Sequence, residues 1–182
     1  MRSIRARGGS DMAADLSDGA LQALAGQAGA LLLAAGRRIA TAESCTGGWV
    51  AKCLTDISGS SQWFERGYVT YSNQSKQQSI GVAASVIDTF GAVSRPTVEQ
   101  MAAGALHASG ADIAVAITGI AGPDGGSADK PVGLVWFALA QRAAAPVAIQ
   151  QQFAGDREAI RRAAVATALR LVIAAATAGE PP

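Results

Sequence analysis

A seven-residue turn, residues 42–48 (Ala-Glu-Ser-Cys-Thr-Gly-Gly), constrains the fold of this chain more than any other stretch. It lies between a β-like run, residues 38–41, and a helix-like run, residues 49–54, so a strand is expected to pass directly into a helix. The unpaired N–H groups that open such a helix point at whatever binds there, and glycine lets a ligand approach the backbone. We interpret the turn as a candidate active site in which Ser44 attacks where negative charge is stabilised.

The same turn has a purely structural interpretation. Serine and threonine are preferred N-cap residues, so Ser44 or Thr46 could cap the following helix without taking part in any chemistry. The seven residues alone leave both interpretations open.

A second strand also runs into a glycine-rich loop. Residues 112–118 are an apolar run of strand length, which is typical of a central strand covered on both faces. The loop that follows, residues 119–127, contains four glycines. Neither glycine loop has the G-x-G-x-x-G spacing of a dinucleotide site or the Gly-Lys-Ser/Thr of a triphosphate loop.

The remaining segments alternate between the hydrophobic periodicity of a strand and that of a helix. Strands are expected at 65–72, 132–140 and 146–153. Helices are expected between Ser17 and Gly36, at 49–57, after Asn73, at 84–90, after Ser94 and from Asp156, which is a plausible cap. The sum is an α/β fold, a three-layer α/β/α sandwich with a mixed, mostly parallel sheet. We expect one domain, residues 16–178, after a disordered tail of residues 1–15.

Composition excludes several classes of function. The chain has 182 residues and a formal net charge of +1, and no basic cluster lies in its periodic part, so a nucleic-acid surface is not expected. Its most apolar segment, 163–178, is interrupted by Arg170 and is shorter than the ~18 to 20 residues of a membrane span. The two cysteines, Cys45 and Cys53, indicate neither a disulfide framework nor a metal site, and fit a reducing, cytoplasmic setting.

The N-terminus carries arginine without an apolar segment, so it does not resemble a secretory signal, although its arginine and serine content leaves a transit peptide as an alternative.

A serine nucleophile needs a partner to take its proton, and lysine can do so when it is buried. The chain has only Lys52, Lys76 and Lys130, and arginine stays protonated. Lys52 is explained by a helical pair with Asp56, and Lys130 lies in a Gly/Ser loop, so Lys76 is left. Because Lys76 lies near the start of a helix and has few carboxylates nearby, we expect its pKa to be lowered. The alternative is that Lys76 is a surface lysine.

Two other side chains, Tyr71 and His107, are relevant to the choice of a catalytic base. Tyr71, on the strand expected at 65–72, lies close to Lys76 in the sequence, and its alternative role is that of a half-buried strand residue. His107 is the only histidine. It lies off the buried stripe of its expected helix, so a Ser-His pair is poorly placed.

Several separated motifs of the chain resemble those of one family. They are residues 41–48 (TAESCTGG), 67–73 (GYVTYSN), 91–94 (GAVS), 118–126 (TGIAGPDGG) and 155–157 (GDR). In this order, they are similar to the CinA C-terminal-domain family of nicotinamide mononucleotide (NMN) deamidases, in the form that stands alone, without the large N-terminal domain of full-length CinA proteins. The resemblance implies hydrolysis of NMN to nicotinate mononucleotide and ammonia in pyridine-nucleotide salvage, with Ser44, Tyr71 and Lys76 as catalytic residues. In this scheme we expect Lys76 to take the Ser44 proton, directly or through Tyr71.

The resemblance also selects Ser44 rather than Cys45 as the nucleophile. Thiolates are intrinsically more reactive, but adjacent side chains at a tight turn diverge, so only one can meet Lys76. Arg157, in the last motif, is the arginine expected to help a glycine loop hold the phosphate, the alternative being a surface charge. The expected substrate-binding residues are Thr46, Gly47, Gly48, Thr118, Gly119, Gly122 and Arg157, with N–H groups near Gly47, Gly48 or Gly119 holding the oxyanion.

No metal and no cofactor are expected, because the chain has one histidine and its acidic residues are scattered. The expected partner is the small-molecule substrate NMN, with no nucleic acid and no membrane, and a homo-oligomer is possible. Two other functions remain open: a non-catalytic binding module for a phosphorylated nucleotide, and an oligomerising scaffold.

Overall fold

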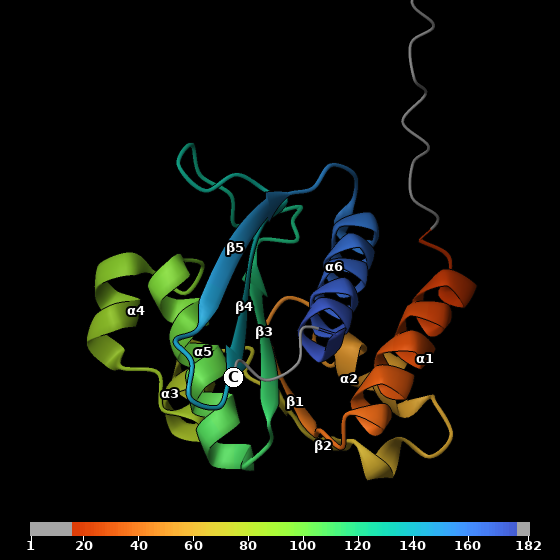
Figure 1. The fold of residues 1–182 in the computed structure, drawn as a ribbon. Helices are drawn as coiled ribbons and strands as arrows, with labels where there is room; N and C mark the ends of the chain where they lie inside the picture. Colours follow the sequence, from red (N-terminus) through yellow and green to blue (C-terminus); the bar gives the residue numbers. More distant parts are fainter. Residues whose placement is uncertain (1–15, 178–182) are drawn as a thin grey trace, which may run out of the picture.

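The computed structural model describes residues 16–177, which form a five-stranded sheet with helices on both faces (Figure 1). The expected tail, residues 1–15, and residue 178 lie outside the described residues. The strands are β1 (Ile39–Glu43), β2 (Phe64–Val69), β3 (Ile113–Gly119), β4 (Leu134–Gln141) and β5 (Val147–Gln152), in the order β2-β1-β3-β4-β5.

The sheet is mixed, as predicted. β1 pairs in parallel with both β2 and β3, whereas β4 is antiparallel to β3 and to β5. Four strands therefore point the same way and β4 alone is reversed. The carboxyl ends of these four strands lie at one edge of the sheet, where the neighbours β2, β1 and β3 form its parallel part.

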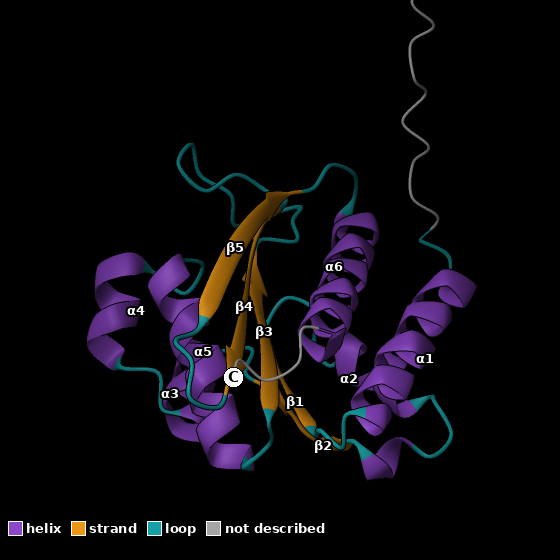
Figure 2. Cartoon of the chain, in the orientation of Figure 1, coloured by secondary structure: helices purple, strands orange, loops and turns teal. Residues whose placement is uncertain are grey.

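The helices divide between the two faces, which completes the predicted three layers (Figure 2). One face is covered by α1 (Asp18–Ala34), α2 (Trp49–Thr55) and α6 (Arg157–Thr177), and the other by α3 (Asn73–Ile80), α4 (Ala84–Phe90) and α5 (Arg95–Ser109). A 3-10 turn, Ser60–Gln62, precedes β2. Within residues 16–177, no helix combines the length and the apolarity needed to cross a membrane.

Side-chain size alternates along the central strands and sorts the two cores. Larger residues such as Ile113, Val115 and Phe137 point toward α1 and α6. Alanines occupy the other face, where α5 packs against them: Ala40, Ala42, Ala114, Ala116, Ala138 and Ala140. Successive strand residues face opposite sides, so this alternation lets α5 approach the sheet closely while the bulk fills the α6 side.

Local signals placed most element ends correctly. Ser94 caps α5, and Asp156 accepts a hydrogen bond from the Ala159 N–H at the start of α6, as predicted. Two expectations were wrong. β2 ends at Val69, so Tyr71 lies beyond the strand, and α3 is capped by Ser72 rather than by Asn73.

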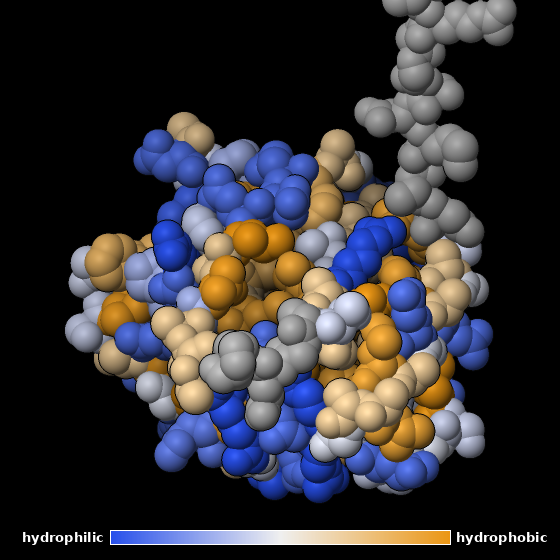
Figure 3. All heavy atoms as spheres, in the orientation of Figure 1, coloured by the Kyte–Doolittle hydropathy of each residue, from blue (hydrophilic) through white to orange (hydrophobic). Residues whose placement is uncertain are grey.

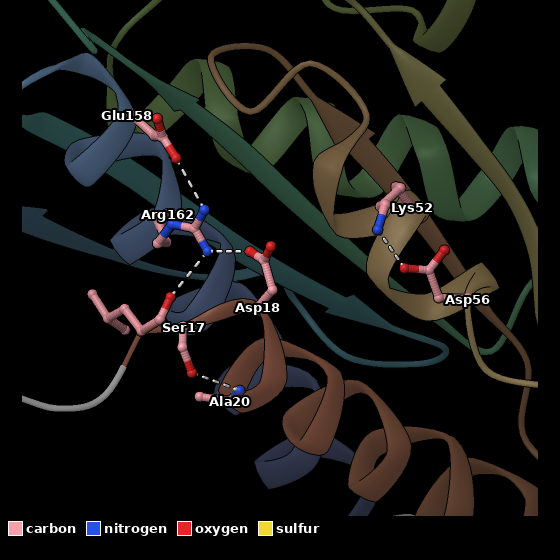
Figure 4. Close-up of polar contacts among 8 residues, drawn as sticks. Ser17, Asp18, Ala20, Lys52, Asp56, Glu158 and Arg162 are labelled. Carbon is pink, nitrogen blue, oxygen red and sulfur yellow. Dashed lines mark hydrogen bonds and ion pairs between the residues drawn. The ribbon is translucent and has the colours of Figure 1, made fainter.

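Polar contacts join α1 to α6 (Figure 4). The guanidinium of Arg162 contacts the carboxylates of Asp18 and Glu158, and it lies 5.0 Å from the ring centre of Trp49. The predicted pair of Lys52 and Asp56 is present on α2 at 2.5 Å and is solvent-exposed.

Hydrophobic side chains remain at the surface beside β5, an edge strand of the sheet, where Val147 is 68% exposed (Figure 3).

Candidate active site

The site lies where the topology of the sheet changes direction. From its carboxyl end the chain leaves β1 toward β2, whereas it leaves the neighbouring β3 toward β4. Open α/β sheets bind ligands in the crevice outside the carboxyl ends of their strands at such a point. Ser44 follows β1, Gly119 ends β3, and a cavity of about 270 Å³ opens between them.

Seven of the predicted site residues line this cavity: Ser44, Tyr71, Lys76, Thr118, Gly119, Gly122 and Arg157. The wall also includes Cys45, Asn73, Ala92, Val93 and Asp124. Residues from five separate stretches of the chain therefore meet in one cavity of a size that suits a small molecule.

Lys76 and Ser44 are in direct contact. The Lys76 Nζ donates to the Ser44 Oγ at 3.0 Å and to the Thr70 carbonyl at 2.7 Å. Lys76 is only 1% exposed, and this burial lowers its pKa from 10.5 to about 8, because the cationic form loses solvation. The alternative that Lys76 is a surface lysine is wrong.

The start of α3 carries Lys76 to this position. Ser72 and Ser75 form a capping box, each hydroxyl accepting from the other residue's N–H. Lys76 follows Ser75 in the first turn of the helix, and its side chain is buried while its neighbours Asn73 and Gln74 are exposed. The end of β2 and the start of α3 thus place the Lys76 amine next to the Ser44 hydroxyl.

Cys45 lines the same cavity but is poorly suited to attack. The side chain is 5% exposed, and burial raises the pKa of its thiol to about 12. The thiolate is the nucleophilic form of cysteine, so a buried neutral thiol is inert at neutral pH.

The turn that follows Ser44 corrects one group of predictions. Thr46, Gly47 and Gly48 do not line the cavity. The Gly47 N–H donates to the Ser44 carbonyl, and the Gly48 N–H donates to the Glu43 carboxylate. These two amides are therefore not available to a substrate.

The two glycines serve the backbone of the turn instead of a ligand. Gly47 and Gly48 have φ values of 63° and 93°, in the left-handed region that side chains with a Cβ rarely adopt. A Cβ on Gly48 would also lie 3.3 Å from the Val69 side chain. Ser44 and Thr46 do not cap α2 by a side-chain hydrogen bond, since no side-chain cap is made at Gly48 and the helix amides go to Glu43.

Glu43 was missed at the level of sequence. It ends β1 fully buried, and its carboxylate accepts from the N–H groups of Gly48, Val50 and Ala51 at 3.0, 3.0 and 2.8 Å. The only local signal is an acidic residue shortly before a helix that lacks a Ser, Thr, Asp or Asn directly at its start, and that pattern does not reveal how far the carboxylate reaches.

Arg157 and Tyr71 meet at the cavity. Arg157 donates to the Tyr71 hydroxyl at 2.9 Å and to the Gly122 carbonyl at 2.7 Å. Tyr71 is 59% exposed, and in the described part of the chain its hydroxyl contacts Arg157 rather than Ser44 or Lys76. The expected relay of a proton through Tyr71 has no contact to support it, because the tyrosine lies beyond β2 instead of within it.

Ala92 and Val93, which line another part of the cavity, end the segment of residues 90–93. Three successive carbonyls of this segment accept side-chain hydrogen bonds: Phe90 from Lys130, Gly91 from Ser94 and Thr97, and Ala92 from Thr118. The distances are 2.7 to 2.9 Å. With these acceptors occupied, the wall presents the apolar side chains of Ala92 and Val93 to the cavity.

Metal ligands do not cluster in the described chain. Among residues 16–177, no three or more His, Cys, Asp or Glu side chains are grouped so that they could hold a metal ion.

Comparisons with known proteins agree on one family. The model of the CinA C-terminal domain matches residues 21–176. The nicotinamide-nucleotide amidohydrolase PncC of Escherichia coli K12 is 56% identical over 155 residues, covering 85% of this chain and 94% of that protein. PncC of Pseudomonas putida is 52% identical over 132 residues, covering 72% and 82%.

A solved structure shares the fold over the same extent. The competence/damage inducible protein CihA of Agrobacterium tumefaciens superposes with a TM-score of 0.83 at 47% identity, covering 85% of this chain and 94% of that one.

Proposed function

Because this chain belongs to the CinA C-terminal domain family, we propose that it is an amidohydrolase that converts NMN to nicotinate mononucleotide and ammonia. The observation that carries the proposal is the contact between Lys76 and Ser44 at 3.0 Å on the wall of the cavity. A serine hydroxyl becomes a nucleophile when an adjacent base removes its proton, and a desolvated lysine is such a base.

The first step is attack on the carboxamide. A neutral Lys76 amine keeps one N–H on the Thr70 carbonyl and uses its lone pair to take the Ser44 proton across the same 3.0 Å contact. The Ser44 Oγ then bonds to the carboxamide carbon, and the carbonyl oxygen becomes an oxyanion. No separate proton relay is required, since nucleophile and base touch directly.

The oxyanion needs a donor close to Ser44. In residues 16–177 the amides of Gly47 and Gly48 are committed to oxygen acceptors, whereas the N–H of Cys45, directly after the nucleophile, contacts only its own thiol sulfur, a weak acceptor. We assign this N–H to the oxyanion, in place of the Gly47 and Gly48 amides expected at first. Preorganised backbone donors of this kind stabilise the charge that develops in the transition state.

The amide then leaves as ammonia. Lys76 returns its proton to the departing nitrogen as the C–N bond breaks, which leaves a nicotinoyl ester on Ser44. Water attacks the ester and gives its proton to Lys76, and the Ser44 Oγ takes that proton back when the ester bond breaks. One water is consumed and one ammonia is released, so the cycle returns Ser44 and Lys76 to their starting states.

The cavity offers complementary surfaces to the two ends of NMN. The apolar wall of Ala92 and Val93 suits the nicotinamide ring. Arg157 suits the phosphate, because a guanidinium has five N–H donors and, within residues 16–177, two hydrogen bonds engage them. On this assignment Tyr71 orients Arg157 toward the substrate.

Release of ammonia from NMN tests the proposal. The wild-type protein should release ammonia, and Ser44→Ala and Lys76→Met should lose orders of magnitude in rate. Lys52→Met is the matched control, since Lys52 is an exposed lysine paired with Asp56 and should be dispensable. Saturable binding of NMN without ammonia would instead favour a non-catalytic binding module.

A further inference from the structure

The carboxylate of Glu43 is an anion held entirely by backbone amides. The residue is 0% exposed, and none of the ion pairs among residues 16–177 includes it. Its two oxygens take the N–H groups of Gly48, Val50 and Ala51, which are the amides that open α2. These amides carry partial positive charge and have no acceptor within the helix, so the arrangement satisfies both partners.

Glu43 also adjoins both members of the catalytic pair. Ser44 follows it directly in the chain. The Glu43 carbonyl accepts from the Thr70 N–H at 2.8 Å, and the Thr70 carbonyl in turn accepts from the Lys76 amine at 2.7 Å. Side chain and main chain of this one residue therefore join the segment after Ser44 to the segment that holds Lys76.

We infer that Glu43 is a positioning residue for the Ser44–Lys76 pair, an inference that rests on the proposed function. Its carboxylate spans the five residues from Ser44 to Gly48 and so fixes the turn, which keeps the Ser44 Oγ on Lys76 and the Cys45 N–H beside the nucleophile. Because the turn carries two glycines at positive φ, its own backbone restrains it weakly. Glu43 touches no reacting atom, and its effect passes through Ser44.

Glu43→Gln isolates this role, because glutamine has the same shape but only one acceptor oxygen. Its NH₂ group must face at least one of the three amides that now donate, so the turn loses a restraint. We expect kcat for NMN to fall by about 10- to 100-fold, since a displacement near 1 Å can cost about 100-fold. KM should change by less than about threefold, because Arg157 and the 90–93 wall are untouched.

Glu43→Asp separates position from charge. It keeps the carboxylate but shortens the side chain by one methylene, so it cannot reach all three amides. The same fall in kcat is expected if position matters. Should Glu43→Gln fail to fold, the Asp variant still decides the question.

A purely structural role for Glu43 would give a different result. Leu169→Ala in the core of α6 is a matched control, since it removes a side chain that is 0% exposed and should lower Tm without touching the turn. With each protein assayed well below its Tm, Leu169→Ala should keep its kcat. If Glu43→Gln and Glu43→Asp lower Tm but also keep the wild-type kcat, the inference is overturned.

Two further measurements keep this inference distinct from the proposed function. Phenylmethylsulfonyl fluoride reacts with an activated serine, forming an O–S bond and releasing fluoride, so the rate of Ser44 labelling by mass spectrometry reports the nucleophile without NMN. We expect slower labelling in both Glu43 variants. Wild-type labelling without ammonia from NMN would refute the substrate alone, whereas equal labelling of wild type and variants would refute the role of Glu43.

The pH profile supplies the last readout. The carboxylate of Glu43 does not contact the Lys76 amine, so Glu43→Gln should keep the wild-type midpoint of activity against pH while its plateau falls. A shifted midpoint would mean that Glu43 acts through its charge, and the positioning role would be wrong.

Discussion

The amine nitrogen of Lys76 lies 3.0 Å from the hydroxyl oxygen of Ser44, although 32 positions separate the two residues. The carbonyl of Thr70, six positions before Lys76, accepts from the same amine at 2.7 Å. A lysine this buried has no solvent to stabilise its charge, so the contact joins a nucleophile to a base whose proton is easily lost.

Activity should therefore follow the ionisation of Lys76. With its pKa lowered to about 8, kcat/KM for NMN should rise with pH through a limb near pH 8 and then level off. Ammonia release measured between about pH 6 and 9.5 gives the profile. Lys76→Arg keeps a positive charge that cannot be lost, so it should be nearly as inactive as Lys76→Met. Near-normal turnover by Lys76→Arg would contradict the mechanism.

The same ionisation should appear in stability. The folded chain binds the Lys76 proton with a pKa of about 8, whereas the unfolded chain binds it at 10.5. Between these values the unfolded state holds more protons, so the free energy of unfolding rises with pH across that window. Urea unfolding of wild type and Lys76→Met at pH 7.5 and 9.5 isolates the effect, because other groups cancel in the comparison. If the difference in free energy of unfolding between wild type and Lys76→Met does not shift in favour of wild type as pH rises, the lowered pKa of Lys76 is refuted.

Cys45 should be dispensable. Its thiol is buried and has a pKa of about 12, so Cys45→Ala should keep ammonia release within about tenfold of wild type. Ser44→Ala should lose orders of magnitude in kcat, as other nucleophile deletions do. Both variants should be checked for folding by circular dichroism. A folded but inactive Cys45→Ala protein would reverse the assignment of the nucleophile.

Arg157 and Tyr71 should act on binding more than on chemistry. Phosphate contacts are similar in ground and transition states, so Arg157→Ala should raise KM for NMN more than it lowers kcat. Tyr71→Phe removes one acceptor of Arg157 at 2.9 Å, so it should raise KM by less. Arg95→Ala is the control, since that arginine pairs with Glu99 on the surface. A loss of orders of magnitude in kcat for Tyr71→Phe would restore the tyrosine as a proton relay.

Much of this molecule could be predicted from local sequence. Helix and strand follow from periodicity and from turn residues near them in the chain, so the alternation of β1, α2 and β2, the cap at Asp156 and the buried central strand β3 were all predicted. Lys76 was reached by elimination among three lysines, each of which has a local environment that the sequence shows.

The tertiary structure alone decided which partner each polar group takes. The amides of Gly47 and Gly48 were expected to face a substrate, but they donate to the Ser44 carbonyl and the Glu43 carboxylate. The Tyr71 hydroxyl was expected near Lys76, but it meets Arg157, 86 positions away. Several acceptors across the fold can pair with the same donor, and which of them does so depends on distances between elements that only packing sets. Periodicity and turn chemistry act over a few residues, so they determine the elements of this protein but not the contacts among them.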